Sequence, residues 1–174
     1  MKRWAALLRG VNLGGRTLLM SDLAALTAGL GFGDVATLLA SGNVTFASDL
    51  PPHEIEARLE AALAAHGLVT DVMVRNRAEL DAVIAGNPWP EAAADHPSHY
   101  LVTFHRDPFP AAALARLQDG PERLHAIDRE LYTDFLSQQG MRESTLLSRM
   151  AKAKFPKVAT GRNWNTVRKL AALL

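Results

Sequence analysis

Arg9-Gly10-Val11-Asn12-Leu13-Gly14-Gly15-Arg16-Thr17 is the stretch that decides how the chain begins to fold. It follows an apolar run, Trp4–Leu8, which has the length of a strand, and it leads into a helical pattern that starts near Ser21. Three glycines allow positive φ or a close approach of the backbone to a ligand. Backbone N–H groups beside two arginines suit an anion such as phosphate or carboxylate. The stretch therefore predicts a strand, a candidate anion-binding loop, and a helix with Ser21 as its N-cap.

The elements that follow this loop have the order of a known supersecondary motif. After the first helix, we predict strands over residues 35–40 and 44–47, a helix over 51–66 and a strand over 69–74. Ser41-Gly42-Asn43 lies between the first two of these strands, and Gly followed by Asn suits a tight hairpin turn. Residues 1–75 therefore have the β-α-β-β-α-β order of a ferredoxin-like subdomain.

A similar pattern recurs in the second half of the chain. Residues 76–97 are predicted to be a connecting segment, in which Asn76 caps a short helix and a proline-bearing loop follows. The later elements are a strand over 100–104, a helix over 110–117, a hairpin over 123–135, and helices over 144–153 and 164–174. A closing strand is not evident. We expect an α+β protein with two tandem ferredoxin-like (βαββαβ-type) subdomains, over 1–75 and 98–174, the second ending in a C-terminal helix, together one compact unit.

Composition excludes several classes of site. The 174 residues include no cysteine, so disulfides, thiolate zinc sites and cysteine nucleophiles are ruled out. The apolar run at the N-terminus is too short for a signal peptide or a membrane span, and we expect a cytoplasmic protein with no membrane association. We predict no metal site and no cofactor, because the histidines of Asp95-His96-Pro97-Ser98-His99 are expected to be solvated in a proline-broken loop.

The charge is distributed unevenly, although the net charge of the chain is only +1. Residues 141–174 carry eight basic side chains and one acidic side chain. Such a segment favours an anionic partner or a complementary internal surface. The near-neutral total argues against a dedicated, high-affinity binder of duplex nucleic acid.

Three polar motifs are candidates for one site. In the predicted topology the first two strands are parallel, so the loop at 9–17 and the turn at 41–43 lie at the same end of the sheet. The third motif is Thr160-Gly161-Arg162-Asn163-Trp164-Asn165-Thr166, in which Asn163 is a predicted N-cap and Arg162 is placed at a helix N-terminus. The predicted ligand-binding residues are Arg9, Asn12, Gly14, Gly15, Ser41, Asn43, Arg162 and Asn163.

These three motifs, taken together, resemble the bacterial family called domain of unknown function 1697. The resemblance rests on residues 9–15, 41–46 and 162–167 and covers nearly the whole chain. It implies a cytoplasmic α+β protein with two ferredoxin-like subdomains, and it brings no established activity. Two positions depart from the family pattern, which usually has Lys where this chain has Arg16 and often has Ala or Thr where it has Gly161.

The glycine-rich loop also comes close to a P-loop, with Arg16 in place of the lysine. A P-loop nucleotidase needs a mostly parallel sheet and an acidic strand for magnesium, and the sequence indicates neither. Two readings stay open: a turn that serves close packing, and an anion site without hydrolysis.

We expect a small protein that binds a phosphate-bearing ligand (a nucleotide, a phosphorylated metabolite or a nucleic acid). The alternatives are an enzyme that acts on such a ligand, in which Arg9 and Arg162 stabilise charge, and a protein–protein assembly module. The sequence leaves catalysis and the oligomeric state open.

Overall fold

A computed structural model describes residues 1–11, 17–117 and 120–174. The chain divides into two compact units. The first comprises Met1–Asp81 with Leu170–Leu174, and the second comprises Ala82–Lys169. The division falls within two helices, α3 (Arg77–Ala85) and α8 (Trp164–Leu173).

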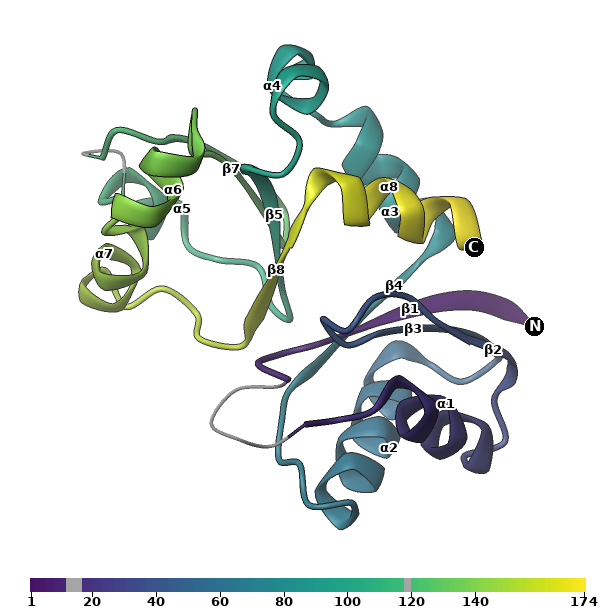
Figure 1. Cartoon of the computed structure of the whole chain (residues 1–174). Helices are drawn as coiled ribbons and strands as arrows, with labels where there is room; N and C mark the ends of the chain where they lie inside the picture. The colour runs from purple at the N-terminus through teal and green to yellow at the C-terminus, as the bar shows by residue number, and fades with distance from the viewer. Residues whose placement is uncertain (12–16, 118–119) are drawn as a thin grey trace. The chain divides into compact units, whose positions relative to one another are not determined.

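The first unit has the predicted β-α-β-β-α-β order. Its elements are β1 (Lys2–Leu8), α1 (Met20–Gly29), β2 (Gly33–Thr37), β3 (Asn43–Ser48), α2 (Pro52–Ala65) and β4 (Val72–Asn76). The strands form an antiparallel sheet in the order β2-β3-β1-β4, which is the ferredoxin-like order. Helices α1 and α2 lie on one face of this sheet (Figure 1).

Alternating and helical periodicities build the core between that face and the two helices. Trp4, Ala6 and Leu8 alternate along β1 and pack in the same buried cluster as Ile55, Leu59 and Leu63 of α2. The residues of α2 are spaced four apart, so they lie on one side of the helix. Every position of β3 is buried, which includes the residues whose side chains point away from these helices.

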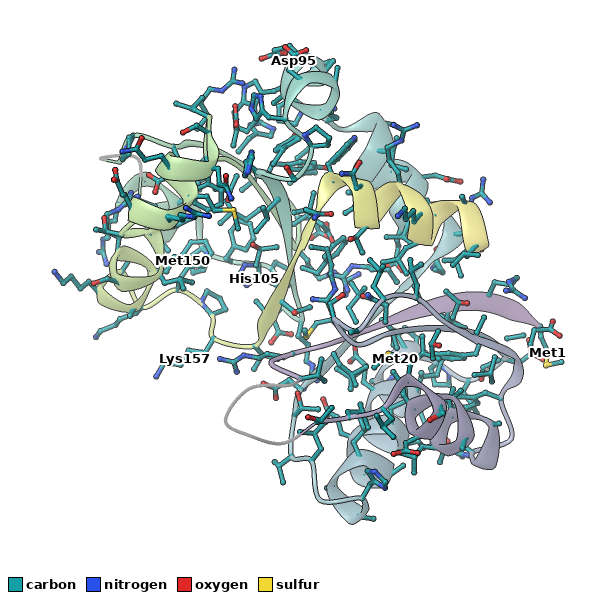
Figure 2. The ribbon with its side chains drawn as sticks, viewed as in Figure 1. Met1, Met20, Asp95, His105, Met150 and Lys157 are labelled. Carbon is teal, nitrogen blue, oxygen red and sulfur yellow. The ribbon has the colours of Figure 1, made fainter. Side chains whose placement is uncertain are left out.

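The second unit has a sheet of the same topology. Its elements are α4 (Pro90–Asp95), β5 (Tyr100–His105), α5 (Ala111–Ala115), β6 (Arg123–Ile127), β7 (Glu130–Asp134), α6 (Gln138–Glu143), α7 (Leu146–Lys152) and β8 (Ala159–Asn163). The strand order is β6-β7-β5-β8, and all neighbouring strands are antiparallel. Leu131 packs in one buried cluster with Leu117 and Leu146. His105 is buried against Phe109 and Phe155 (Figure 2).

The central strand of each sheet pairs with its closing strand in the same register. Leu8 pairs with Val72 in the first sheet, and His105 pairs with Ala159 in the second. Beyond these pairs, the Arg9 N–H donates to the Asp71 carbonyl at 3.0 Å, and the Arg106 N–H donates to the Val158 carbonyl at 3.1 Å. The internal duplication expected from the sequence is therefore confirmed, and it preserves the register of the strands.

Three local predictions are wrong. The second unit does have a closing strand, β8, which lacks the apolar alternation that marks most strands. The loop after residue 90 contains a helix, α4. Ser21 is not an N-cap, because α1 begins at Met20 after Leu19, which makes no side-chain capping bond. Among the described residues, no helix is both long enough and apolar enough to cross a bilayer.

Candidate functional site

Three connections meet at one end of the first unit, where β1 ends. Their described residues are 9–11 with 17–19, 38–42 and 66–71, and this group is called the first loop end. The Leu8 N–H donates to the Gly42 carbonyl at 2.9 Å, and the Thr70 hydroxyl donates to the Arg9 carbonyl. The prediction that the ends of the first two strands lie together is confirmed by these bonds.

The turn that contains Ser41 and Asn43 is held by the asparagine. Asn43 is fully buried, and its amide donates to the Leu38 carbonyl at 2.8 Å and to Ser41 Oγ at 2.9 Å. Leu39 and Gly42 have φ of 61° and 79°, so the backbone adopts the left-handed region at both positions of the turn. The buried Asn43 side chain therefore holds the backbone of the turn in place, while Ser41 is exposed.

Arg9 is exposed at the same end and pairs with an acidic residue. Its guanidinium lies 2.9 Å from the Asp71 carboxylate, and its side chain is 46% exposed. A guanidinium carries five N–H donors, so a single carboxylate contact does not use up its capacity to bind an anion. Asn12, Gly14 and Gly15, which we predicted to complete this site, lie outside the described residues.

A cavity of about 420 Å³ opens at the first loop end. It is lined by residues before α1 and after α2, namely Thr17, Leu18, His66, Gly67 and Leu68. His66 Nε2 lies 3.6 Å from Asp22 Oδ2 of α1. The volume is within the range of small-molecule sites. This cavity was not predictable from the sequence, because the pattern at residues 66–68 indicates only the end of a helix.

Arg162 and Asn163 belong to the second unit and have structural partners there. Arg162 lies in β8, directly before Asn163 and the start of α8, and it is 6% exposed. Its guanidinium donates to Thr160 Oγ1 at 2.7 Å and to the Gly161 carbonyl at 2.9 Å. Burial lowers the pKa of Arg162 to about 10. That these two residues join Arg9 in one site stays a prediction.

Asn163 is an N-cap, as predicted. Its side-chain oxygen accepts a bond of 3.0 Å from the Thr166 N–H in the first turn of α8. The first unit repeats this arrangement, because Asn76 Oδ1 accepts a bond of 3.0 Å from the Glu79 N–H of α3. Arg75, which precedes Asn76, is fully buried, and its counterpart Arg162 is nearly so. An Arg-Asn pair that ends a strand and caps a helix is thus a duplicated structural motif, which an internal comparison of residues 72–79 with 159–166 reveals.

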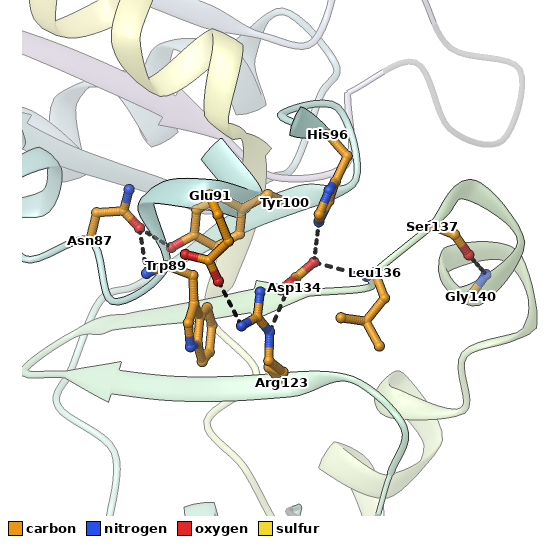
Figure 3. Close-up of polar contacts among 10 residues, drawn as sticks. All are labelled: Asn87, Trp89, Glu91, His96, Tyr100, Arg123, Asp134, Leu136, Ser137 and Gly140. Atoms are coloured by element: carbon orange, nitrogen blue, oxygen red, sulfur yellow. Dashed lines mark hydrogen bonds and ion pairs between the residues drawn. The ribbon is translucent and has the colours of Figure 1, made fainter. Parts of the chain in front are cut away.

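A second group of polar side chains surrounds Asp134, at the end of β7 (Figure 3). Asp134 is fully buried, and its carboxylate accepts bonds from His96 Nε2 at 2.8 Å, from Arg123 Nε at 2.9 Å and from the Leu136 N–H at 2.8 Å. Arg123 also donates to Glu91 at 2.8 Å, and its guanidinium lies 4.8 Å from the centre of the Trp89 ring. The prediction that His96 is solvated in a loop is therefore wrong, because its ring is bonded to Asp134.

This group ties α4 to the sheet of the second unit. Burial by itself raises the pKa of Asp134, but the bonds from Leu136, Arg123 and His96 outweigh it, so the pKa lies below its ordinary value. Each carboxylate oxygen already accepts at least two hydrogen bonds. The arrangement is that of a structural ion pair. In the described part of the chain, no group of three histidines and carboxylates is placed to hold a metal ion.

Comparison with known proteins agrees with this fold. The family model described as "Protein of unknown function (DUF1697)" matches residues 1–132. The chain belongs to that family. A solved structure described as conserved bacterial protein SP0830 from Streptococcus pneumoniae is similar to this DUF1697 protein, with a TM-score of 0.79 and 21% identity. The match covers 99% of this chain and 98% of that one, and it supports the fold. No curated protein matches the chain.

Proposed function

We propose that this DUF1697 protein is a cytoplasmic protein that binds a small phosphate-bearing ligand at the first loop end. The observation that carries the proposal is the cavity of about 420 Å³, which lies at the same end of the unit as the exposed Arg9 and Ser41. A cavity of this size accommodates a nucleotide or a phosphorylated metabolite rather than a polymer.

The polar groups at this end have complementary tasks in the proposal. Arg9 supplies forked N–H donors for phosphate oxygens, and Ser41 and Thr17 supply hydroxyl groups. Asp71 holds the Arg9 guanidinium at 2.9 Å. Leu18 and Leu68 offer an apolar wall for the remainder of the ligand.

One observation favours the alternative that the ligand is also chemically transformed. His66 lines the cavity and lies 3.6 Å from Asp22. A histidine beside a carboxylate is a common general base, and the three sequence motifs offered none. In this alternative, replacement of His66 by Gln removes turnover and leaves ligand binding in place.

The binding proposal is tested by thermal unfolding with inorganic phosphate and with adenosine 5′-monophosphate as probes. A ligand present at 100 times its Kd stabilises the native state by about 2.7 kcal/mol. We expect this gain for the wild type and its loss in Arg9→Gln. Arg58→Gln is a matched control, since Arg58 is also 46% exposed and also pairs with a carboxylate of the first unit.

Two outcomes overturn the proposal. The first is a folded wild-type protein whose melting temperature does not respond to either probe. The second is an equal loss of the ligand effect in Arg9→Gln and Arg58→Gln, which assigns the effect to the net charge of the unit. If the substitutions instead change sedimentation or co-purification of a partner, the assembly module is the better description.

A further inference from the structure

The duplicated register identifies the corresponding end of the second unit, where β5 ends. Arg106 occupies the place of Arg9, because each follows the last residue of a central strand and bonds to the strand that closes its sheet. The His105 N–H donates to the Arg129 carbonyl at 2.8 Å, as the Leu8 N–H donates to the Gly42 carbonyl. Arg129 therefore corresponds to Gly42.

The charge at this second loop end differs from that at the first. By the same register, Val158 stands where Asp71 pairs with Arg9, and Lys157 stands where Thr70 lies. The duplication thus keeps one arginine, replaces its acidic neighbour by an apolar residue, and adds two cations. The turn of the second unit also gains one carboxylate, because Asp128 corresponds to Ser41.

Two further lysines reach the same end from α7. The helix ends at Lys152, Lys154 follows in a left-handed conformation with φ of 55°, and the chain then enters β8 beside Arg106. Lys152, Lys154 and Lys157 are exposed, and Lys157 points away from the ribbon (Figure 2). The second loop end is defined here as the five cations Arg106, Arg129, Lys152, Lys154 and Lys157, with Asp107 and Asp128 as its acidic members.

The backbone that carries these lysines is anchored. Phe155 is 4% exposed, and it stacks on Phe109 with ring centres 5.0 Å apart and also contacts His105. The Phe155 N–H donates to the Met150 carbonyl at 2.9 Å. The lysines on either side of Phe155 are therefore presented on a fixed loop, while their side chains extend into solvent.

We propose that the second loop end binds the phosphate backbone of a nucleic acid. Its cations come from three separate segments. The three lysines are exposed, and the two arginines are half-buried, with Arg129 Nε 3.6 Å from the Asp128 carboxylate. The local excess of positive charge suits the phosphates of a nucleic acid. Lysine is a compact charge on a flexible stem, which suits contacts with a backbone rather than with base edges. The binding is expected to be independent of sequence. This surface belongs to a different unit from the proposed small-ligand site and does not depend on it.

The test is fluorescence anisotropy with a labelled 20-base-pair DNA duplex over 50–200 mM salt. We compare the wild type with the triple variant Lys152→Gln, Lys154→Gln and Lys157→Gln. The slope of log K against log salt is negative. Loss of three phosphate contacts makes it shallower by about 2.7, at about 0.9 per contact. At 0.1 M salt the same slope corresponds to a loss of affinity of roughly two to three orders of magnitude.

A matched control removes the same charge elsewhere. Arg142, Arg168 and Lys169 are exposed and lie outside the second loop end, and their replacement by Gln is expected to leave most of the binding and its salt slope unchanged. Circular dichroism shows whether each triple variant folds. Arg9→Gln is expected to bind the duplex as the wild type does, which separates this proposal from the small-ligand site.

Three results overturn the inference. They are the absence of duplex binding at 50 mM salt, an equal loss in the two triple variants, and displacement of the duplex by polyglutamate at equal charge concentration. The last result assigns the surface to an acidic protein instead.

Discussion

Replacement of Gly42 by Ala tests whether the turn at 38–42 closes against the end of β1. A Cβ at position 42 would lie 2.7 Å from one Val11 methyl group, 3.1 Å from the other, and 3.1 Å from Leu8 Cβ. Gly42 also has a φ of 79°, which L residues avoid. The substitution therefore combines backbone strain with a steric collision.

The two contributions have separable magnitudes. The left-handed conformation costs a residue with a side chain about 1 kcal/mol relative to glycine. Insertion of a methyl group into a filled space costs a further amount of about 1–3 kcal/mol. The cost lies in the upper half of that range when the neighbouring side chain cannot move away. Val11 is β-branched, so its methyl groups have little freedom to move. We expect Gly42→Ala to lower the free energy of unfolding by about 3 kcal/mol.

Urea unfolding followed by circular dichroism measures the loss, and two variants serve as controls. Gly31 has a φ of 81° with open space around the added Cβ, so Gly31→Ala is expected to cost only the backbone strain of about 1 kcal/mol. Val11→Ala combined with Gly42→Ala is expected to recover more than 1 kcal/mol relative to the single variant. Equal costs for Gly42→Ala and Gly31→Ala, with no recovery in the double variant, would refute the close approach of the turn to Val11.

Three further predictions concern the duplicated cap and the Asp134 ion pair. Asn163→Ala and Asn76→Ala are each expected to lower the unfolding free energy by about 1 kcal/mol in urea titrations, because each removes an equivalent bond to a helix N–H. Asp134→Asn is expected to lower the unfolding free energy by about 3 kcal/mol in the same titrations. This is the low end of the cost of breaking a buried ion pair, because Arg123 keeps its bond to Glu91. The folded-state pKa of Asp134 lies below its ordinary value of 3.8, so its stabilising contribution is complete above that pH and is lost as the pH falls through the folded-state value. Acid titration of wild type and Asp134→Asn should therefore show a smaller loss of stability below pH 4 in the variant.

The fold was largely predictable because glycines and prolines separate the elements of the first 75 residues. The two strands of the second hairpin were also foreseen, with Arg123–Ile127 as the first of them. Strand β8 escaped prediction because Thr160, Gly161 and Arg162 show no apolar alternation, and the register against β5 places them in the sheet. Helix α6 was missed since it contains Gly140, which is a poor helix former.

The candidate site was predictable in location but not in the task of each residue. Parallel directions of the first two strands brought Arg9 and Ser41 to one end, as topology required. That Asn43 is buried and holds the turn depends on side-chain bonds that no spacing reveals. The same applies to His66, whose place beside the cavity follows from the direction of α2 and the position of α1.

The duplication separates what the fold requires from what the function selects. Where both units keep a feature, as with the buried arginines 75 and 162 and the capping asparagines 76 and 163, a structural need explains it without a ligand. Where the units differ at matched positions, structure alone does not demand the difference. Asp71 and Val158 are such a pair, and so are Thr70 and Lys157, and both lie at the loop ends. The loop ends are therefore where the two halves have diverged in chemistry, one towards a cavity and an arginine paired with Asp71, the other towards a group of cations whose lysines are exposed.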